Sequence, residues 1–400
     1  MQPASAAGPL DGIRVVEFSV AMTGPFAAAI LADQGADVVK VERPGIGDIC
    51  RWVGTSVNGM SAAFLLCNRG KRSIAIDLAT PDGLDIARRL CAEADVVIQN
   101  FRTGVMDRLG LGYHDIAADN PGVIYASLSG YGSAGPYAHR SAYDLAIQGY
   151  GGVASVQADP TDGVPVFVRQ TVADKVTALF AAQAISAALY AREHGAGGQH
   201  LESSMMDSIV SFLWLDCAGN EVLMDSDDST PSSMVGGFAP FEFQDGWGVV
   251  VPTSDDDFAG VCRAFGVDGY DDPEVATMAA RWNNSGAVTA IFDLCRAHAA
   301  NLTKAEATRR LDAERVPFSM VVSPKELIDD EHALAIGLLE KQHHPIAGQV
   351  RMPRHPTRFS ATPASLGRPA PALGQHTTEI LEEIGAGDRA ADLRERGVVA

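Results

Sequence analysis

Asp174 is the residue of this 400-residue chain with the clearest capacity for chemistry. It follows an extended apolar run at 164–168 and opens a long alanine-rich segment that predicts a helix. The first N–H groups of a helix lack partners and its dipole is positive there, so a carboxylate at this point stays ionised and can act as a nucleophile. We therefore expect Asp174 to face a cavity. The alternative is that it only caps its helix, since Asp is a preferred N-cap residue.

Basic side chains gather in the first half of an otherwise acidic chain. The chain has 31 Lys and Arg against 50 Asp and Glu, a formal net charge of −19. This balance excludes a nucleic-acid partner, because a phosphate backbone needs a basic face. It permits a local site for a small phosphorylated molecule, although such a cluster is also typical of a solvated surface. The clustered residues are Arg69, Lys71, Arg72, Arg102, Arg108 and Arg140.

A glycine-rich turn at 130–135 fits the G-x-G-x-x-G fingerprint of dinucleotide sites. Pro136 and Tyr137 follow its third glycine, where the fingerprint requires a helix whose first turn binds the pyrophosphate. We therefore interpret this segment as a turn that lines a ligand cleft, and not as an NAD site.

Predicted strands and helices alternate through the first half of the chain. We expect strands at 13–18, 37–41, 73–78, 95–99 and 123–129, with helices over 25–34 and 81–94. This alternation predicts a parallel, doubly wound, Rossmann-like α/β sheet with its ligand crevice beyond the strand carboxyl ends. Several candidate phosphate-binding or amide side chains fall at the predicted strand ends: Arg43, Arg72, Asn100, Arg102 and Arg108.

The second half of the chain changes in composition. The helix after Asp174 is apolar on all sides through Leu189, so we expect it to be buried. A polar stretch follows as a linker, and then a hairpin and four helices predict a small α+β domain. The expected boundaries are 9–223 for the first part of a large domain, 224–237 for the linker, 238–322 for the small domain and 323–400 for a last segment.

The overall composition is that of a globular protein, with 46% hydrophobic and 20% charged residues. We expect no membrane span, because no stretch of about 18 apolar residues lacks charges or glycines. The N-terminus does not resemble a signal peptide, so a cytoplasmic location is expected. Six Cys and ten His show no metal-ligand spacing, so no metal site is expected.

The order of several segments resembles the family III CoA-transferases, the formyl-CoA and carnitine CoA-transferase group that includes the α-methylacyl-CoA racemases. The resemblance runs from about residue 9 to the C-terminus. The matching segments are 9–18, Gly24-Pro25, 35–45, 68–73, 99–102, 141–145 and 373–377.

The resemblance implies that Asp174 is a covalent nucleophile in the transfer of CoA from an acyl-CoA donor to a small carboxylic acid, through aspartyl anhydride and thioester intermediates. It implies a C-terminal segment that returns to the large domain, an interlocked homodimer, and no permanently bound cofactor. By this resemblance and by their chemistry, the expected CoA contacts are Arg43, Arg72, Asn100, Phe101, Arg102, Arg108 and Tyr143.

Three positions depart from the family pattern. Tyr143 stands where the racemases have a catalytic histidine, and a tyrosine phenol, with a reference pKa of about 10, is a poor base. Met22 replaces a glutamine of the formyl-CoA enzymes, and Gly236-Gly237 is shorter than their glycine loop. We therefore favour a transferase over the two alternatives, an acyl-CoA racemase and a non-catalytic CoA-binding protein.

Overall fold

The computed structural model describes residues 8–159, 161–225 and 239–400. Contacts divide the chain into two compact units: Met1–Ser232 with Gly337–Ala400, and Ser233–Ile336. Most of the expected linker, including Gly236 and Gly237, lies outside the described residues.

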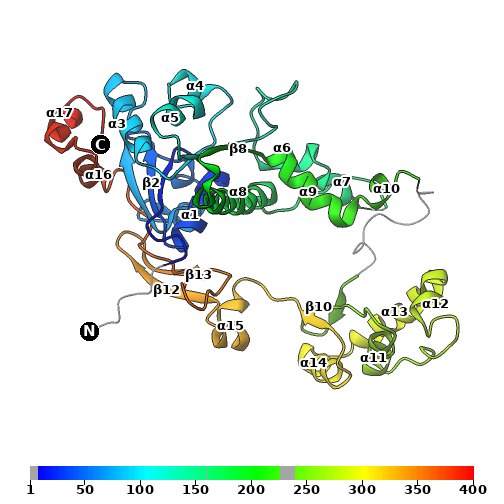
Figure 1. The fold of residues 1–400 in the computed structure, drawn as a ribbon. Coiled ribbons are helices and arrows are strands. Elements are labelled where there is room, and N and C mark those ends of the chain that lie inside the picture. The colour runs from blue at the N-terminus through cyan, green and yellow to red at the C-terminus, as the bar shows by residue number, and fades with distance from the viewer. Residues whose placement is uncertain (1–7, 160, 226–238) are drawn as a thin grey trace. The chain divides into compact units, whose positions relative to one another are not determined.

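Six parallel strands form the central sheet of the first unit, in the order β5-β2-β1-β6-β7-β8 (Figure 1). The parallel sheet predicted from the sequence is confirmed. The strand order reverses between β1 and β6, and such a switch point is where doubly wound sheets bind ligands, beyond the strand carboxyl ends. The strands are β1 (Arg14–Glu17), β2 (Asp37–Glu42), β5 (Lys71–Ala75), β6 (Val96–Gln99), β7 (Ile124–Ser129) and β8 (Gln199–Ser204).

Helices cover both faces of this sheet. Successive residues of a strand point to opposite faces, so each strand contributes apolar side chains to both layers. Val15 belongs to the core that contains α1 (Thr23–Asp33) and α8 (Val172–Ala191). The next residue, Val16, belongs to the opposite core, which contains α3 (Pro81–Ala92). Each strand is therefore apolar on both faces.

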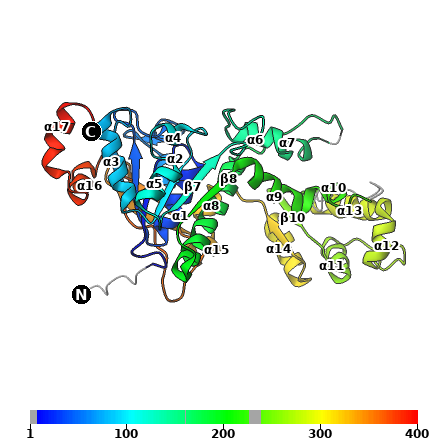
Figure 2. The same cartoon turned by 45° about the horizontal axis from the view of Figure 1, so that its top comes forward.

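The C-terminal segment completes the α3 layer. Figure 2 places α16 (Thr377–Glu383) and α17 (Ala390–Glu395) beside α3, and side chains of all three helices share one core. Asp77 N donates to the Val398 carbonyl at 2.8 Å. The chain re-enters the first unit at Gly337 and not at 323, because the short elements between these points group with the second unit.

Helix α8 is buried on one side only, so the expectation of a fully buried helix is wrong. Ala178 and Ile185 are fully covered, whereas Leu179 and Phe180 expose 54% and 43% of their surface. Within the described part of the chain, one helical stretch, Val172–Ala196, is long and apolar enough to cross a membrane, and half of its apolar window is buried. Because α8 packs on α1 and α9 (Met205–Cys217), we interpret it as a core helix.

The second unit is an antiparallel sheet with helices around a phenylalanine-rich core. Its strand order is β11-β10-β9, with the β9–β10 hairpin turning at Asp245 and Gly246 as the sequence indicates. The strands are β9 (Phe241–Phe243), β10 (Gly246–Val250) and β11 (Phe318–Met320), and the helices are α11 (Asp255–Phe265), α12 (Met278–Asn283), α13 (Ser285–Ala299) and α14 (Lys304–Ala313).

Candidate active site

Asp174 lies in the first turn of α8 and lines a cavity of about 280 Å³ at the carboxyl edge of the sheet. The helix is preceded by Thr171 as its N-cap residue, so Asp174 is not the cap. Side chains from three strand ends and from α1 line the same cavity, which we call the Asp174 cavity. It contains an acidic side chain where a ligand of an α/β sheet would bind.

Two elements hold Asp174 in place. The hydroxyl of Thr23, in the first turn of α1, donates to Asp174 Oδ1. The Asp174 backbone N–H donates to Oδ2 of the buried Asp144 at 3.0 Å, and Asp144 Oδ1 accepts from Gln148 Nε2 at 2.5 Å. Asp174 Oδ2 has no hydrogen-bond partner among the residues that the structure describes. One carboxylate oxygen is therefore anchored while the other is available to a ligand.

Burial raises the pKa of Asp174 to about 6, and the neighbouring Asp144 carboxylate adds to this rise. The hydrogen bond from Thr23 and the charge of Lys175 oppose it. Desolvation therefore raises the pKa although Asp174 stands in the first turn of a helix, and the ionised carboxylate expected from the sequence is present above about pH 6. Above about pH 6, Asp174 is a poorly solvated carboxylate, and such a group is a better nucleophile than a hydrated one.

The turn between β1 and α1 forms one wall of the cavity and is tightly held. The Asn100 amide accepts from Val20 N at 2.9 Å and donates to the Val20 carbonyl at 2.7 Å. Ala21, in a left-handed conformation with φ 66°, donates its N–H to Asp48 Oδ1 at 2.9 Å. Asn100 lines the cavity, but this pairing uses its amide to position the turn that leads to Thr23.

A buried ion network lies behind this turn. Glu17 pairs with Lys71 at 2.6 Å and with Lys40 at 3.1 Å, and all three side chains are fully buried. Burial lowers the pKa of Lys71 to about 8, against the attraction of Glu17. Lys40 also pairs with Asp48 at 2.9 Å and donates to the Ser19 carbonyl. Lys71, one of the clustered basic residues, is therefore part of a buried ion pair and is not available to a ligand.

Arg72 is not brought to the Asp174 cavity, which corrects its assignment as a CoA contact. It lies near the start of β5, whereas the cavity is at the carboxyl edge of the sheet. Its guanidinium pairs with Asp37 at 2.5 Å, with Glu379 at 3.0 Å and with Glu383 at 2.6 Å. Three carboxylates already satisfy this cation. Arg69 is likewise paired with Asp33 at 2.6 Å.

The other expected CoA contacts divide into two groups. Arg43 and Arg108 are exposed and do not line the Asp174 cavity. Within the described part of the chain, Arg102 and Arg140 have no ion-pair partner. The expected residues that the cavity brings together with Asp174 are Asn100, Phe101, Arg102 and Tyr143, and Arg140 joins them.

Sequence reasoning missed Thr23 and the role of Asp144. Thr23 precedes the Gly24-Pro25 pair at the predicted strand-to-helix turn, and a hydroxyl at that turn was the available signal. Asp144 lies in the matching segment 141–145, to which no role was assigned beyond Tyr143. Its bond to the Asp174 backbone depends on the packing of α6 (Asp144–Tyr150) against α8, which local sequence does not reveal.

Comparisons with known proteins agree with this fold. The sequence profile of CoA-transferase family III matches residues 10–377. Succinyl-CoA:glutarate CoA-transferase from Mus musculus is 33% identical over 381 residues, covering 94% of this chain and 86% of the relative. Formyl-CoA:oxalate CoA-transferase from Rhodopseudomonas palustris strain TIE-1 is 31% identical over 426 residues, covering 98% of this chain and 97% of the relative.

A solved structure gives the same result. The crystal structure of a CAIB/BAIF family protein from Brucella suis matches with a TM-score of 0.80 and 32% identity, covering 94% of this chain and 100% of that one. The chain therefore belongs to CoA-transferase family III, and the resemblance read from its sequence is confirmed. It is a CoA-transferase, an enzyme that uses CoA thioesters as substrates.

Proposed function

We propose that this enzyme transfers CoA from an acyl-CoA donor to a small carboxylic acid through covalent intermediates on Asp174. The observation that carries this proposal is the half-anchored Asp174 carboxylate: Thr23 holds one oxygen, and the other has no partner among the described residues. A nucleophile held in this way divides one difficult exchange into easier steps.

The proposed reaction has four steps. Asp174 Oδ2 attacks the donor thioester carbonyl, which gives an acyl-aspartyl anhydride and CoA thiolate. The thiolate then attacks the aspartyl carbonyl, which forms an aspartyl thioester and releases the donor acid. The acceptor carboxylate attacks that thioester and forms a new anhydride with release of thiolate. The thiolate finally attacks the acceptor's acyl carbonyl, so the new acyl-CoA leaves and Asp174 is restored.

Binding of CoA in this scheme falls to cations at the carboxyl edge. Arg102 and Arg140 line the Asp174 cavity without an ion-pair partner in the described residues, and a guanidinium binds phosphate through two parallel hydrogen bonds. Phe101 and Tyr143 supply apolar surface beside them. We propose that Arg43 and Arg108, both exposed, contribute at the outer end of the ligand. Retention of the thiolate between steps avoids a second loss of association entropy.

The named relatives act on glutarate and on oxalate, so short carboxylic acids with a polar group at the distal end are the first acceptors to test. The acceptor carboxylate must reach the side-chain carbonyl carbon of Asp174 in the aspartyl thioester, and the distal part of the acid must lie in adjoining space.

We further propose a cytoplasmic homodimer. Apolar side chains on α8 and α9, including Leu179, Phe180, Phe212 and Leu215, are exposed in the single chain, and Leu215 exposes 86% of its surface. Contiguous exposed apolar surface is typical of protein interfaces. A stable folded monomer in sedimentation experiments at low concentration would refute the dimer.

A donor-by-acceptor screen with mass detection of acyl-CoA products tests the function. We expect transfer to at least one acid by the wild type and none by Asp174→Asn. Incubation with a 2-methylacyl-CoA in heavy water separates transfer from racemisation, since transfer leaves the Cα–H bond intact. Rapid deuterium uptake at Cα without any transfer would replace the proposal with a racemase.

A further inference from the structure

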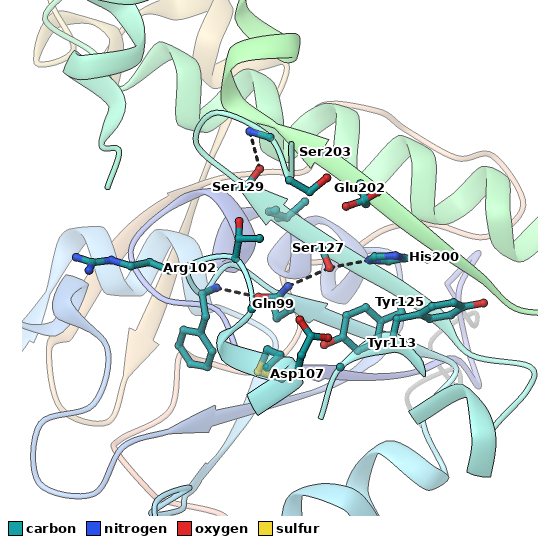
Figure 3. Close-up of a pocket in the computed structure, with 18 of the residues that line it drawn as sticks. Gln99, Arg102, Asp107, Tyr113, Tyr125, Ser127, Ser129, His200, Glu202 and Ser203 are labelled. Atoms are coloured by element: carbon teal, nitrogen blue, oxygen red, sulfur yellow. Dashed lines mark hydrogen bonds between the residues drawn. The ribbon is translucent and has the colours of Figure 1, made fainter. Parts of the chain in front are cut away.

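A second cavity, of about 450 Å³, adjoins the Asp174 cavity. Figure 3 shows residues that line it. The two cavities share a wall made by two segments, 101–103 and 128–129. We call the second cavity the His200 cavity. Its floor is formed by side chains of β6, β7 and β8. Apart from Phe101 and Arg102, which line both cavities, its residues have no role in the proposed transfer.

Polar side chains on the floor are joined across three strands. Phe101 N donates to Gln99 Oε1 at 2.9 Å, so the other end of that amide, Nε2, donates to Ser127 Oγ at 2.9 Å. Ser127 Oγ also lies 2.9 Å from His200 Nε2. We assign the Ser127 hydroxyl as the donor in this contact, which places the His200 ring proton on Nδ1. Figure 3 shows this chain from Gln99 to His200.

The His200 ring is neutral and fixed. Its plane stacks on Tyr113 at 4.9 Å between ring centroids, with 13° between the planes. Burial lowers the pKa of His200 from its usual value. Its Nδ1 has no hydrogen-bond partner among the residues that the structure describes, so it offers one directed donor to a ligand.

The charges of this cavity exclude a polyanion. Asp107, Glu202 and Asp207 line it, against Arg102 as the one cation among its lining residues. The Asp107 and Glu202 carboxylates have no partner within the described residues. Phosphate and carboxylate groups would be repelled here, so neither the CoA nucleotide nor a second carboxylate fits the floor. A hydroxyl group fits, because it can donate to Glu202 and accept from His200.

We propose that the His200 cavity receives the hydroxylated distal part of the acceptor acid, so that the enzyme prefers hydroxy acids to their unsubstituted counterparts. This inference rests on the proposed function, since the acceptor carboxylate is taken to lie at Asp174 on the other side of the shared wall. Ser127, through its bond to His200, acts as a positioning residue, and His200 and Glu202 make the contacts.

The test compares short linear acids with their terminally hydroxylated counterparts of equal chain length. Variants are Glu202→Gln, His200→Phe, which keeps the stack on Tyr113, and Ser186→Ala as a control that removes a hydroxyl from α8. Loss of the neutral hydrogen bond from His200 in His200→Phe should lower kcat/KM for the hydroxy acid by about 2- to 10-fold. Glu202→Gln exchanges a charged acceptor for a weaker neutral one, so it should lower the same value. The unsubstituted acid and CoA affinity should be unaffected, and the control should resemble the wild type.

Calorimetric binding of the hydroxy acid in the presence of CoA decides the inference independently of turnover. Weaker binding in His200→Phe, with unchanged CoA affinity, supports it. An equal loss of affinity for the hydroxy acid and for its unsubstituted counterpart, or weaker CoA binding, would overturn the inference. Absence of transfer to every acid would refute the proposed function. The binding comparison would still test whether the His200 cavity binds the hydroxyl group.

Discussion

The Thr23 hydroxyl donates a hydrogen bond to the Asp174 carboxylate, joining the first turns of two helices that are 151 residues apart in the chain. Helices α1 and α8 pack on the same face of the sheet, so their N-termini meet at its carboxyl edge. The bond favours the ionised carboxylate, whereas burial favours the neutral one. Thr23 therefore increases the fraction of Asp174 that is ionised, and so able to act as a nucleophile, at a given pH.

Replacement of Thr23 by Val should move the acid limb of the kcat/KM profile to higher pH. The wild-type limb should lie near the Asp174 pKa of about 6. A hydrogen bond to a charged group contributes about 1.5–3 kcal/mol, which corresponds to about 1–2 pH units. Thr23→Ser keeps the hydroxyl and should restore the wild-type limb. An unchanged limb in the Val variant would show that the bond does not influence the nucleophile.

Asp174→Asn should stabilise the folded protein at neutral pH while it abolishes transfer. The folded-state pKa is raised from 3.8 to about 6, so the folded state binds the proton more tightly. The stability from that proton is present below the unfolded value and is lost as pH rises through about 6. At about 1.4 kcal/mol per pKa unit, the wild type loses up to about 3 kcal/mol.

Urea denaturation at about pH 8 and about pH 5.5 measures this effect. The Asn variant should be more stable by about 1–3 kcal/mol at the higher pH, and its advantage should shrink at the lower pH. An advantage that is the same at both pH values, or a destabilised variant, would contradict the assignment of a desolvated carboxylate.

Replacement of Arg102 should affect CoA affinity, whereas replacement of Arg72 should affect the stability of the fold. Arg102→Ala should weaken CoA binding by about 1.5–3 kcal/mol, the usual contribution of a charge-assisted hydrogen bond, with little change in stability. Arg72→Ala leaves Asp37, Glu379 and Glu383 without their cation, so it should destabilise the fold and leave CoA affinity intact. Calorimetric titration with CoA and denaturation of both variants provide the comparison. Equal CoA affinities in the two variants would contradict it.

Local pattern was sufficient for the elements of the sheet. Strand–helix alternation predicts parallel strands, and because their carboxyl ends share one edge, the segment 100–102 lies beside Val20 after β1 and Leu128 of β7. The position of Asp174 at the start of a long apolar helix was also predictable locally, whereas its role as a nucleophile was implied by the family resemblance. These features depend on neighbours within a few residues.

Long-range packing decided the rest. Arg72 was misassigned because Glu379 and Glu383, about 300 residues further along, neutralise it. The Thr23 bond and the desolvation of Asp174 likewise depend on how α1 and α8 meet. The exposed side chains of α8 could not be anticipated, because its sequence is apolar on faces that the single chain leaves uncovered.

Chemical trapping of the enzyme during turnover tests the central claim most directly. Incubation with an acyl-CoA donor followed by hydroxylamine should convert Asp174 to its hydroxamate, because hydroxylamine attacks the aspartyl anhydride or thioester. Peptide mass spectrometry should find this mark on the peptide that contains Asp174, only when donor is present, and not in Asp174→Asn. Efficient transfer without a mark at Asp174, together with full activity of the Asn variant, would contradict the account.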